Sequence, residues 1–118
     1  MADAALFVGW GQVVRGREER ALDVFNETIE FYGQMQADAR IESFEVCLLD
    51  PHGGELAGFE LLRGSAEQID ALSRSEDFQR LMVKASLVVD DLGVVDAAIG
   101  EGLGRQVAIY QQEIGVLA

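Results

Sequence analysis

Residues 41–64, IESFEVCLLDPHGGELAGFELLRG, decide the predicted fold, because they read as two strands joined by a tight turn. In the turn at residues 51–54, PHGG, the proline presets one backbone angle and the glycines tolerate the positive φ values that a reversal needs. A four-residue loop places Asp50 opposite Glu55 and fixes all the cross-strand pairs behind them. The stretch therefore predicts a β-hairpin with a defined register.

In that register the two faces of the hairpin differ, because side chains alternate along a strand. One face sets Glu45 directly opposite Glu60, and two like charges at such a position are unfavourable unless a proton, a cation or water intervenes. This carboxylate pair is the feature of the hairpin that most suggests a function. The other face is apolar, and we expect helices to cover its residues Phe44, Val46, Leu48, Ala57, Phe59 and Leu61.

The composition is that of a globular protein with a single domain over residues 1–118. Hydrophobic residues make up 49% of the chain and charged residues 25%, and this length suffices for one core without disulfides or metals. The net charge of -12 arises from 9 basic and 21 acidic residues. Such an acidic chain is not expected to bind nucleic acid, which requires clustered Lys and Arg.

The cysteine count and the first residues predict a cytoplasmic location. One cysteine forms no internal disulfide, which fits a reducing compartment. The opening MADAALFVGWGQVV lacks the basic start and the long apolar run of a signal peptide or a membrane span. We therefore expect no membrane partner.

Hydrophobic periodicity and capping patterns predict the other elements. Ser65 and Gln68, for example, form a capping-box pattern at the start of a short helix. In chain order the predicted elements are a strand over residues 4–14, an amphipathic helix over 17–37, the hairpin, the short helix after residue 64, a helix over 76–86, a strand over 93–100 and a helix from about residue 102.

This βαββαβ order predicts an α+β, ferredoxin-like fold, in which an antiparallel sheet carries its helices on one face. The second face of the sheet would present Leu49, Leu56 and Leu62, for which water is a poor partner. We therefore expect a homodimer in which a second copy packs face to face and encloses a small cavity, forming a dimeric α+β barrel.

Four segments resemble the dimeric α+β barrel superfamily: the strand–GREE–helix opening, the IESFEV…PHGGELAGF hairpin, the RSEDFQRL helix and the late VVDAAIG strand. The superfamily includes antibiotic-biosynthesis-type monooxygenases and EthD-like, YCII-like and stress-responsive barrel proteins. The chain looks most like small bacterial members with no assigned activity. The resemblance covers nearly the whole chain. It implies a homodimer with a ligand cavity in each subunit, and some members are enzymes without metal or organic cofactor.

The candidate catalytic residues are Glu45, Glu60 and His52. In a dry cavity one of two close carboxylates would have its pKa raised toward neutrality and would suit acid–base work. His52 is the single histidine of the chain, although a histidine in a turn is usually solvated. The candidate ligand-binding residues are Trp10, Cys47, Gly58 and Asp96.

Each candidate also has a simpler structural explanation. Trp10 and Cys47 are more often core residues than ligand contacts, and the two glutamates could reach solvent or a basic group such as Arg105. No residues have the spacing of a metal site, so we expect no metal and no cofactor. Three functions stay open: a dimer that binds a small organic molecule, a cofactor-independent monooxygenase- or isomerase-type enzyme with a cavity carboxylate as base, and a non-catalytic structural or regulatory dimer.

Overall fold

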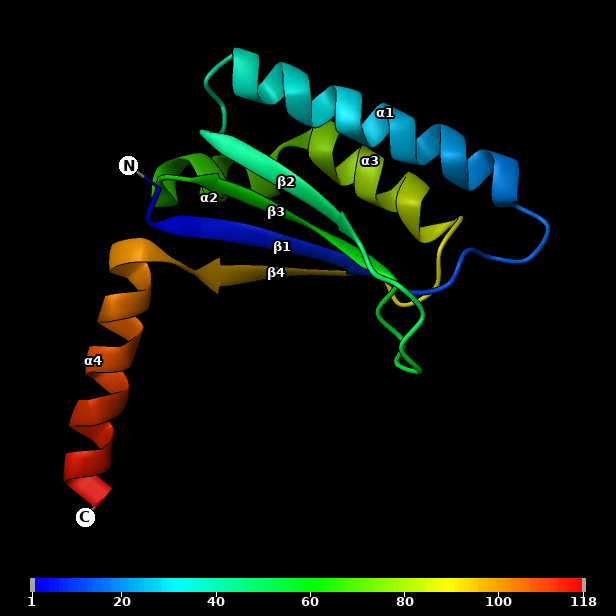
Figure 1. The fold of residues 1–118 in the computed structure, drawn as a ribbon. Helices are drawn as coiled ribbons and strands as arrows, with labels where there is room; N and C mark the ends of the chain where they lie inside the picture. The colour runs from blue at the N-terminus through cyan, green and yellow to red at the C-terminus, as the bar shows by residue number, and fades with distance from the viewer. Residues whose placement is uncertain (1, 118) are drawn as a thin grey trace.

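The structure, a computed structural model, describes residues 2–117, which fold around one four-stranded sheet (Figure 1). The element order confirms the predicted α+β fold. The elements are β1 (Ala4–Trp10), α1 (Glu18–Ala37), β2 (Ser43–Leu48), β3 (Gly58–Gly64), α2 (Ala66–Arg74), α3 (Glu76–Ser86), β4 (Gly93–Ala98) and α4 (Gly100–Leu117).

The sheet is antiparallel, and its strand order is β2-β3-β1-β4. Helices α1, α2 and α3 cover one face, whereas α4 leaves the end of β4 on the other side and runs away from the sheet (Figure 1). This is the predicted ferredoxin-like arrangement, with one face of the sheet left uncovered in the single chain. None of the helices within residues 2–117 is long and apolar enough to cross a membrane.

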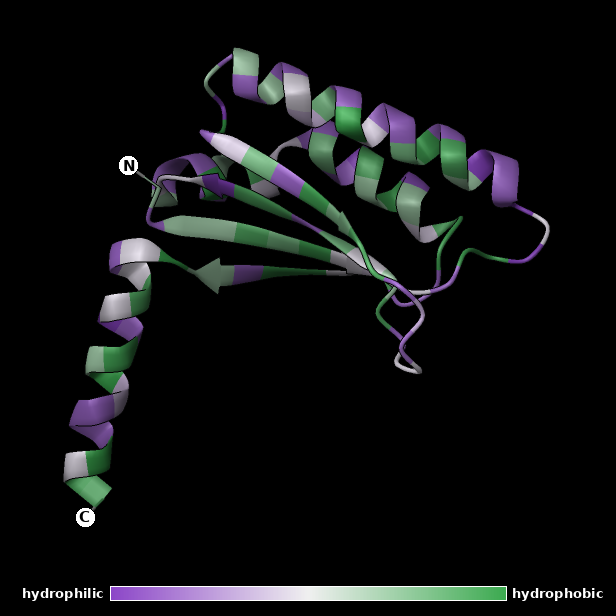
Figure 2. Cartoon of the chain, in the orientation of Figure 1, coloured by the Kyte–Doolittle hydropathy of each residue, from purple (hydrophilic) through white to green (hydrophobic). Residues whose placement is uncertain are grey.

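The core lies between the sheet and the three helices that cover it. Hydrophobic residues (green in Figure 2) lie along the strands and on the sides of the helices that face them. The predicted capping box is present at the start of α2, where the Ser65 Oγ accepts a hydrogen bond from the Gln68 N–H at 3.1 Å and the Gln68 Oε1 accepts one from the Ser65 N–H at 2.8 Å. The buried core residues are Leu6, Val8, Tyr32, Met35, Ile41, Leu62, Ile69, Leu72 and Phe78.

The register of β2 and β3 differs by one residue from the predicted register. Glu45 pairs with Leu61, and Glu60 pairs with Val46. Directly paired residues point to the same side of a sheet, so Glu60 faces the helices and Glu45 faces away from them. The predicted Glu45–Glu60 pair is therefore wrong, because the two carboxylates lie on opposite faces.

A longer loop between the two strands causes this shift. The connection comprises residues 49–57 rather than four residues. The Leu49 N–H donates to the Ala57 carbonyl at 2.9 Å, and Gly53 supplies a positive φ of 85°. A shift of one residue reverses the side chains of β3 relative to those of β2, so the predicted helix-facing set is correct for Phe44 and Val46 and wrong for Phe59 and Leu61. Leu48 points to the helix side but is 69% exposed, and Ala57 lies in the loop.

The uncovered face of the sheet is apolar, although its residues are not the predicted leucines. Leu62 belongs to the core and is 0% exposed. Instead, Phe7 and Phe59 stack with their ring centroids 5.4 Å apart. Leu61 and Val95 both pair with Phe7 and therefore share this face.

Gly58→Ala is expected to destabilise the protein, because a methyl group has no room at this position. A Cβ at Gly58 would lie 2.6 Å from the Trp10 ring and 2.8 Å from the Cys47 carbonyl oxygen. Overpacking of this kind costs about 1–3 kcal/mol.

Gly93→Ala in β4 is the matched control, since a Cβ there meets nothing within 4 Å. Urea unfolding at equal protein concentrations measures both free energies of unfolding. Equal values for Gly58→Ala and the control would contradict the packing of Trp10 over Gly58.

Candidate functional site

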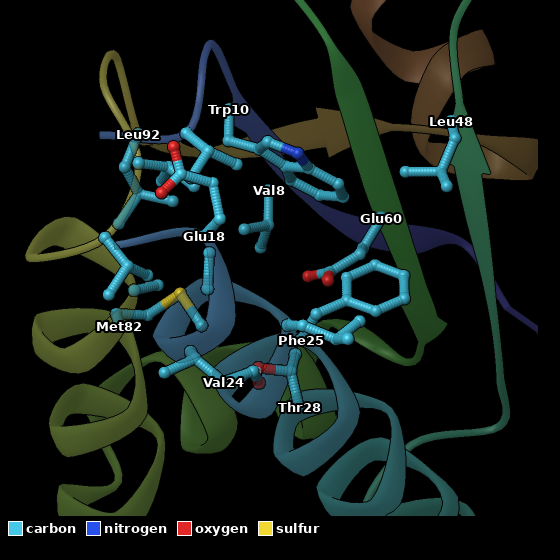
Figure 3. A pocket seen from close by; sticks show the side chains of 16 residues that line it. Val8, Trp10, Glu18, Val24, Phe25, Thr28, Leu48, Glu60, Met82 and Leu92 are labelled. Atoms are coloured by element: carbon cyan, nitrogen blue, oxygen red, sulfur yellow. Dashed lines mark hydrogen bonds between the residues drawn. The ribbon is translucent and has the colours of Figure 1, made fainter. Parts of the chain in front are cut away.

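A cavity of about 360 Å³ lies between the sheet and helices α1 and α3 (Figure 3). This volume falls within the range of about 300–1,000 Å³ that is usual for small-molecule sites. The cavity lies on the helix-covered face of the sheet, not on the face where we expected a second copy to enclose one. Most of the lining side chains are apolar, among them Val8, Trp10, Phe25, Met82 and Leu92.

Glu60 is the central polar group of this cavity. Its side chain points from β3 into the space (Figure 3), and the residue is only 3% exposed. The Tyr32 hydroxyl on α1 donates a hydrogen bond to the Glu60 Oε1 at 2.7 Å. None of the described residues that line the cavity is basic, so no lining side chain supplies a positive charge to the carboxylate.

Burial raises the pKa of Glu60 to about 7, because water no longer solvates the charged form. The hydrogen bond from Tyr32 acts in the opposite direction and lowers the pKa of Glu60. Burial and the neighbouring Glu60 carboxylate raise the pKa of Tyr32 far above its ordinary value, so its hydroxyl remains a donor. A carboxyl that titrates near neutral pH can both accept and release a proton, as general acid–base chemistry requires.

Aromatic rings form one wall of the cavity. Trp10 and Phe25 meet edge to face, with ring centroids 6.2 Å apart. Gly58 pairs directly with Trp10 across β1 and β3, and the indole occupies the room that the missing side chain leaves. Gly58 is one of the candidate ligand-binding residues, and the Trp10 ring therefore occupies the space beside it.

The cavity opens to solvent near the first turns of α1 and the end of β2. Leu22 and Leu48 line it there and are 60% and 69% exposed. Glu18, the first residue of α1, also lines it and is exposed. A molecule entering by this route would pass apolar side chains before it reached Glu60.

Three other predicted site residues lie outside the cavity. Glu45 is on the uncovered face of the sheet, where it forms an ion pair with Arg63. Cys47 pairs with Phe59 on the same face and is half-buried. Asp96 is exposed on the edge strand β4.

His52 holds the loop between β2 and β3 and does not line the cavity. Its Nδ1 accepts a hydrogen bond from the Gly54 N–H at 3.2 Å, and its Nε2 lies 2.7 Å from the Leu56 carbonyl oxygen. These contacts fit a neutral ring with its proton on Nε2. Across residues 2–117, no group of three or more His, Cys, Asp or Glu side chains could hold a metal ion.

The structure thus brings Trp10 and Glu60 together and adds a site residue that the sequence analysis missed, Tyr32. This tyrosine lies among the apolar residues of the amphipathic helix predicted over residues 17–37, where a core role is the simpler expectation. The available signal was its hydroxyl group, because a buried tyrosine usually finds a hydrogen-bond partner.

No model of a known protein family and no curated protein sequence matches this chain. Several solved structures share its fold. An EthD family protein from Bacillus halodurans superimposes with a TM-score of 0.65 at 10% identity, covering 85% of this chain and 100% of the other. A dimeric ferredoxin-like protein of unknown function from Jannaschia sp. gives a TM-score of 0.62 at 12% identity, covering 81% and 98%.

SnoaB, a cofactor-independent oxygenase from Streptomyces nogalater, gives a TM-score of 0.55 at 16% identity, covering 84% of this chain and 95% of the other. At such identities the likeness shows the fold alone. The predicted resemblance is confirmed at that level: this chain has the ferredoxin-like α+β fold of the EthD, SnoaB and antibiotic biosynthesis monooxygenase structures.

Proposed function

We propose that the cavity beneath α1 and α3 binds a small, mainly apolar organic molecule through one polar group that meets Glu60. The observation that supports this most is a single buried carboxyl in a mainly apolar cavity of about 360 Å³. Small-molecule sites are usually concave and apolar, with a few polar groups that fix the orientation of the ligand. Glu60 suits that role, because the Tyr32 hydroxyl engages its Oε1 and no residue within 2–117 donates a hydrogen bond to its Oε2.

A second function, proton transfer, is favoured by the Glu60 pKa of about 7. The carboxylate would accept a proton from a weakly acidic hydroxyl or carbon of the bound molecule and leave its conjugate base. Return of the proton to a different atom would complete an isomerisation. Proton removal could also begin a reaction with oxygen, and SnoaB is a cofactor-independent oxygenase with this fold.

We also infer a homodimer formed through the uncovered face of the sheet. The stacked Phe7 and Phe59, with Leu61 beside them, form an apolar surface that a second copy would remove from water. Two structures with this fold, from Bacteroides fragilis and Jannaschia sp., are described as dimeric.

We also propose a cytoplasmic location, with which the free thiol of Cys47 is consistent.

Binding of 1-naphthol tests the first function, because this probe joins an apolar ring system to one hydroxyl group. Trp10 is the single tryptophan of the chain and lines the cavity, so its fluorescence should change saturably on binding. Ala85→Phe places a large side chain in the cavity wall and should weaken the affinity at least tenfold, as measured by calorimetry.

Ala71→Phe is the matched control, because Ala71 is exposed on α2 and away from the cavity. It should bind 1-naphthol as the parent protein does. Failure of the parent protein to bind, or equal binding by Ala85→Phe, would contradict the proposed site.

The titration of Glu60 tests the electrostatics of the site. In ¹³C NMR the Glu60 carboxyl should titrate with a midpoint near the pKa of about 7, well above its ordinary value of 4.5. Tyr32→Phe removes a hydrogen bond that stabilises the carboxylate and should raise the midpoint further. An unshifted midpoint in the parent protein would contradict the burial of this group.

The same pKa shift predicts how the stability of the protein depends on pH. Because the pKa of Glu60 is raised in the folded state, its contribution is fully present below about pH 4.5 and is lost as the pH rises through about 7. The loss amounts to at most about 3 kcal/mol. Urea unfolding at several pH values should show this loss in the parent protein and in Glu45→Gln, but not in Glu60→Gln.

Proton transfer is tested with 2-indanone, a small ketone with weakly acidic protons next to its carbonyl group. In D₂O near neutral pH the protein should accelerate deuterium incorporation at these carbons, as followed by proton NMR. Glu60→Gln should remove the acceleration and Glu45→Gln should keep it. Acceleration that survives in Glu60→Gln would exclude Glu60 as the base.

A further inference from the structure

We infer that α4 is a docking arm for a second copy of this chain, an inference that rests on the proposed homodimer and extends its contact surface. The helix comprises 18 residues, Gly100–Leu117, and none of them is buried. It projects from the edge of the sheet on the side opposite to α1 and α3 (Figure 1). The helix thus projects away from the sheet on the side of the uncovered face, where the second copy is proposed to pack.

The start of α4 lies against the amino-terminal segment of the chain. Gly100 has a positive φ of 53°, and a Cβ there would lie 2.9 Å from the Ala2 carbonyl oxygen. One turn later the Arg105 Nη2 lies 3.2 Å from the Asp3 Oδ2. The first turns of α4 thus lie close to the amino-terminal segment, whereas its later residues lie outside the rest of the subunit.

The apolar residues of α4 form a regular seam, which we define as Leu103, Val107, Tyr110, Ile114 and Leu117. Their spacing of four, three, four and three residues is the heptad pattern by which helices pack along a partner. Each member of the seam is between 47% and 87% exposed in the single chain. Water is a poor partner for a continuous apolar row of this length.

Outside the seam α4 carries six polar side chains and two further large apolar ones, and the polar ones are Glu101, Arg105, Gln106, Gln111, Gln112 and Glu113. Ile109 and Val116 lie on another side and are 53% and 78% exposed. Its charged residues are limited to Glu101, Arg105 and Glu113. Ile109 and Val116 extend the exposed apolar surface of α4 beyond the seam.

Charge favours a second copy over a membrane surface as the occupant of the seam. Membrane-binding helices use several Lys or Arg side chains to approach anionic lipids. The basic residues of α4 consist of Arg105 alone, which already pairs with Asp3.

The length of α4 indicates where the helix would lie on the second copy. At 1.5 Å per residue α4 extends about 27 Å, whereas packed sheets lie about 10 Å apart. In a face-to-face dimer the helix would therefore pass the edge of the partner's sheet and continue along its flank. Four strands about 20 Å long cover a projected area of only about 400 Å², whereas a standard interface buries about 800 Å² per partner. Contacts made by α4 would enlarge the interface beyond the area of the sheet.

Sedimentation equilibrium of seam variants tests the inference. Val107→Gln combined with Ile114→Gln removes two apolar seam residues, and glutamine is at least as good a helix former as either. The control combines Ala108→Gln with Gly115→Gln, which introduces the same side chains one residue further along, off the seam. We expect the parent chain to be a dimer at micromolar concentration, the seam variant to have a dissociation constant at least tenfold higher, and the control to stay within threefold of the parent.

The other outcomes of the sedimentation experiment distinguish the docking arm from the homodimer itself. An unchanged dissociation constant in the seam variant, or an equal rise in the control, would overturn the docking arm and leave the homodimer in place. A monomeric parent chain would overturn both. Binding of 1-naphthol, measured on the same samples, reports separately on the proposed cavity function.

Discussion

The hydrogen bond from the Tyr32 hydroxyl to the Glu60 carboxyl, 2.7 Å long, joins α1 to the centre of the sheet and depends on the register of β3. A shift of β3 by one residue would bring Leu61 beneath α1 and leave the buried Tyr32 hydroxyl without its acceptor. Leaving a buried polar group unsatisfied costs about 1–3 kcal/mol. The shift would also expose Leu62 and bury Arg63, so packing and hydrogen bonding favour the same register.

The cavity exists because small side chains of the helices face an open part of the sheet. Ala21 and Ala85 line it from α1 and α3, and neither can fill the space above Val8 and Trp10. Protein interiors are normally packed as densely as organic crystals, and larger side chains at these two positions could have closed the gap. A mainly apolar space that is left open around a carboxyl with a pKa of about 7 supports the binding site that we propose.

The order of the elements could be predicted because each depends on a local pattern, such as the capping box of Ser65 and Gln68. The register of the hairpin could not be predicted, because Pro51 and Gly53 are compatible with both a short and a long loop. The site depended on the register, and its second polar group, Tyr32, lies 28 residues from Glu60 in sequence. Trp10 and Glu60 were named from the sequence, but Glu60 was named for a contact with Glu45 that the register does not allow.

Strand β3 connects the cavity with the surface proposed for dimerisation, because its successive residues point to opposite faces. Glu60 faces the cavity, while Phe59 and Leu61 on either side of it face away from the helices. A second copy packed against these two side chains would restrict the backbone that carries the Glu60 carboxyl. The hydrogen bond from Tyr32 restrains the same residue from the other face. The position of the carboxyl would then depend on both layers, so the dimer contact would help to orient a group that it does not touch.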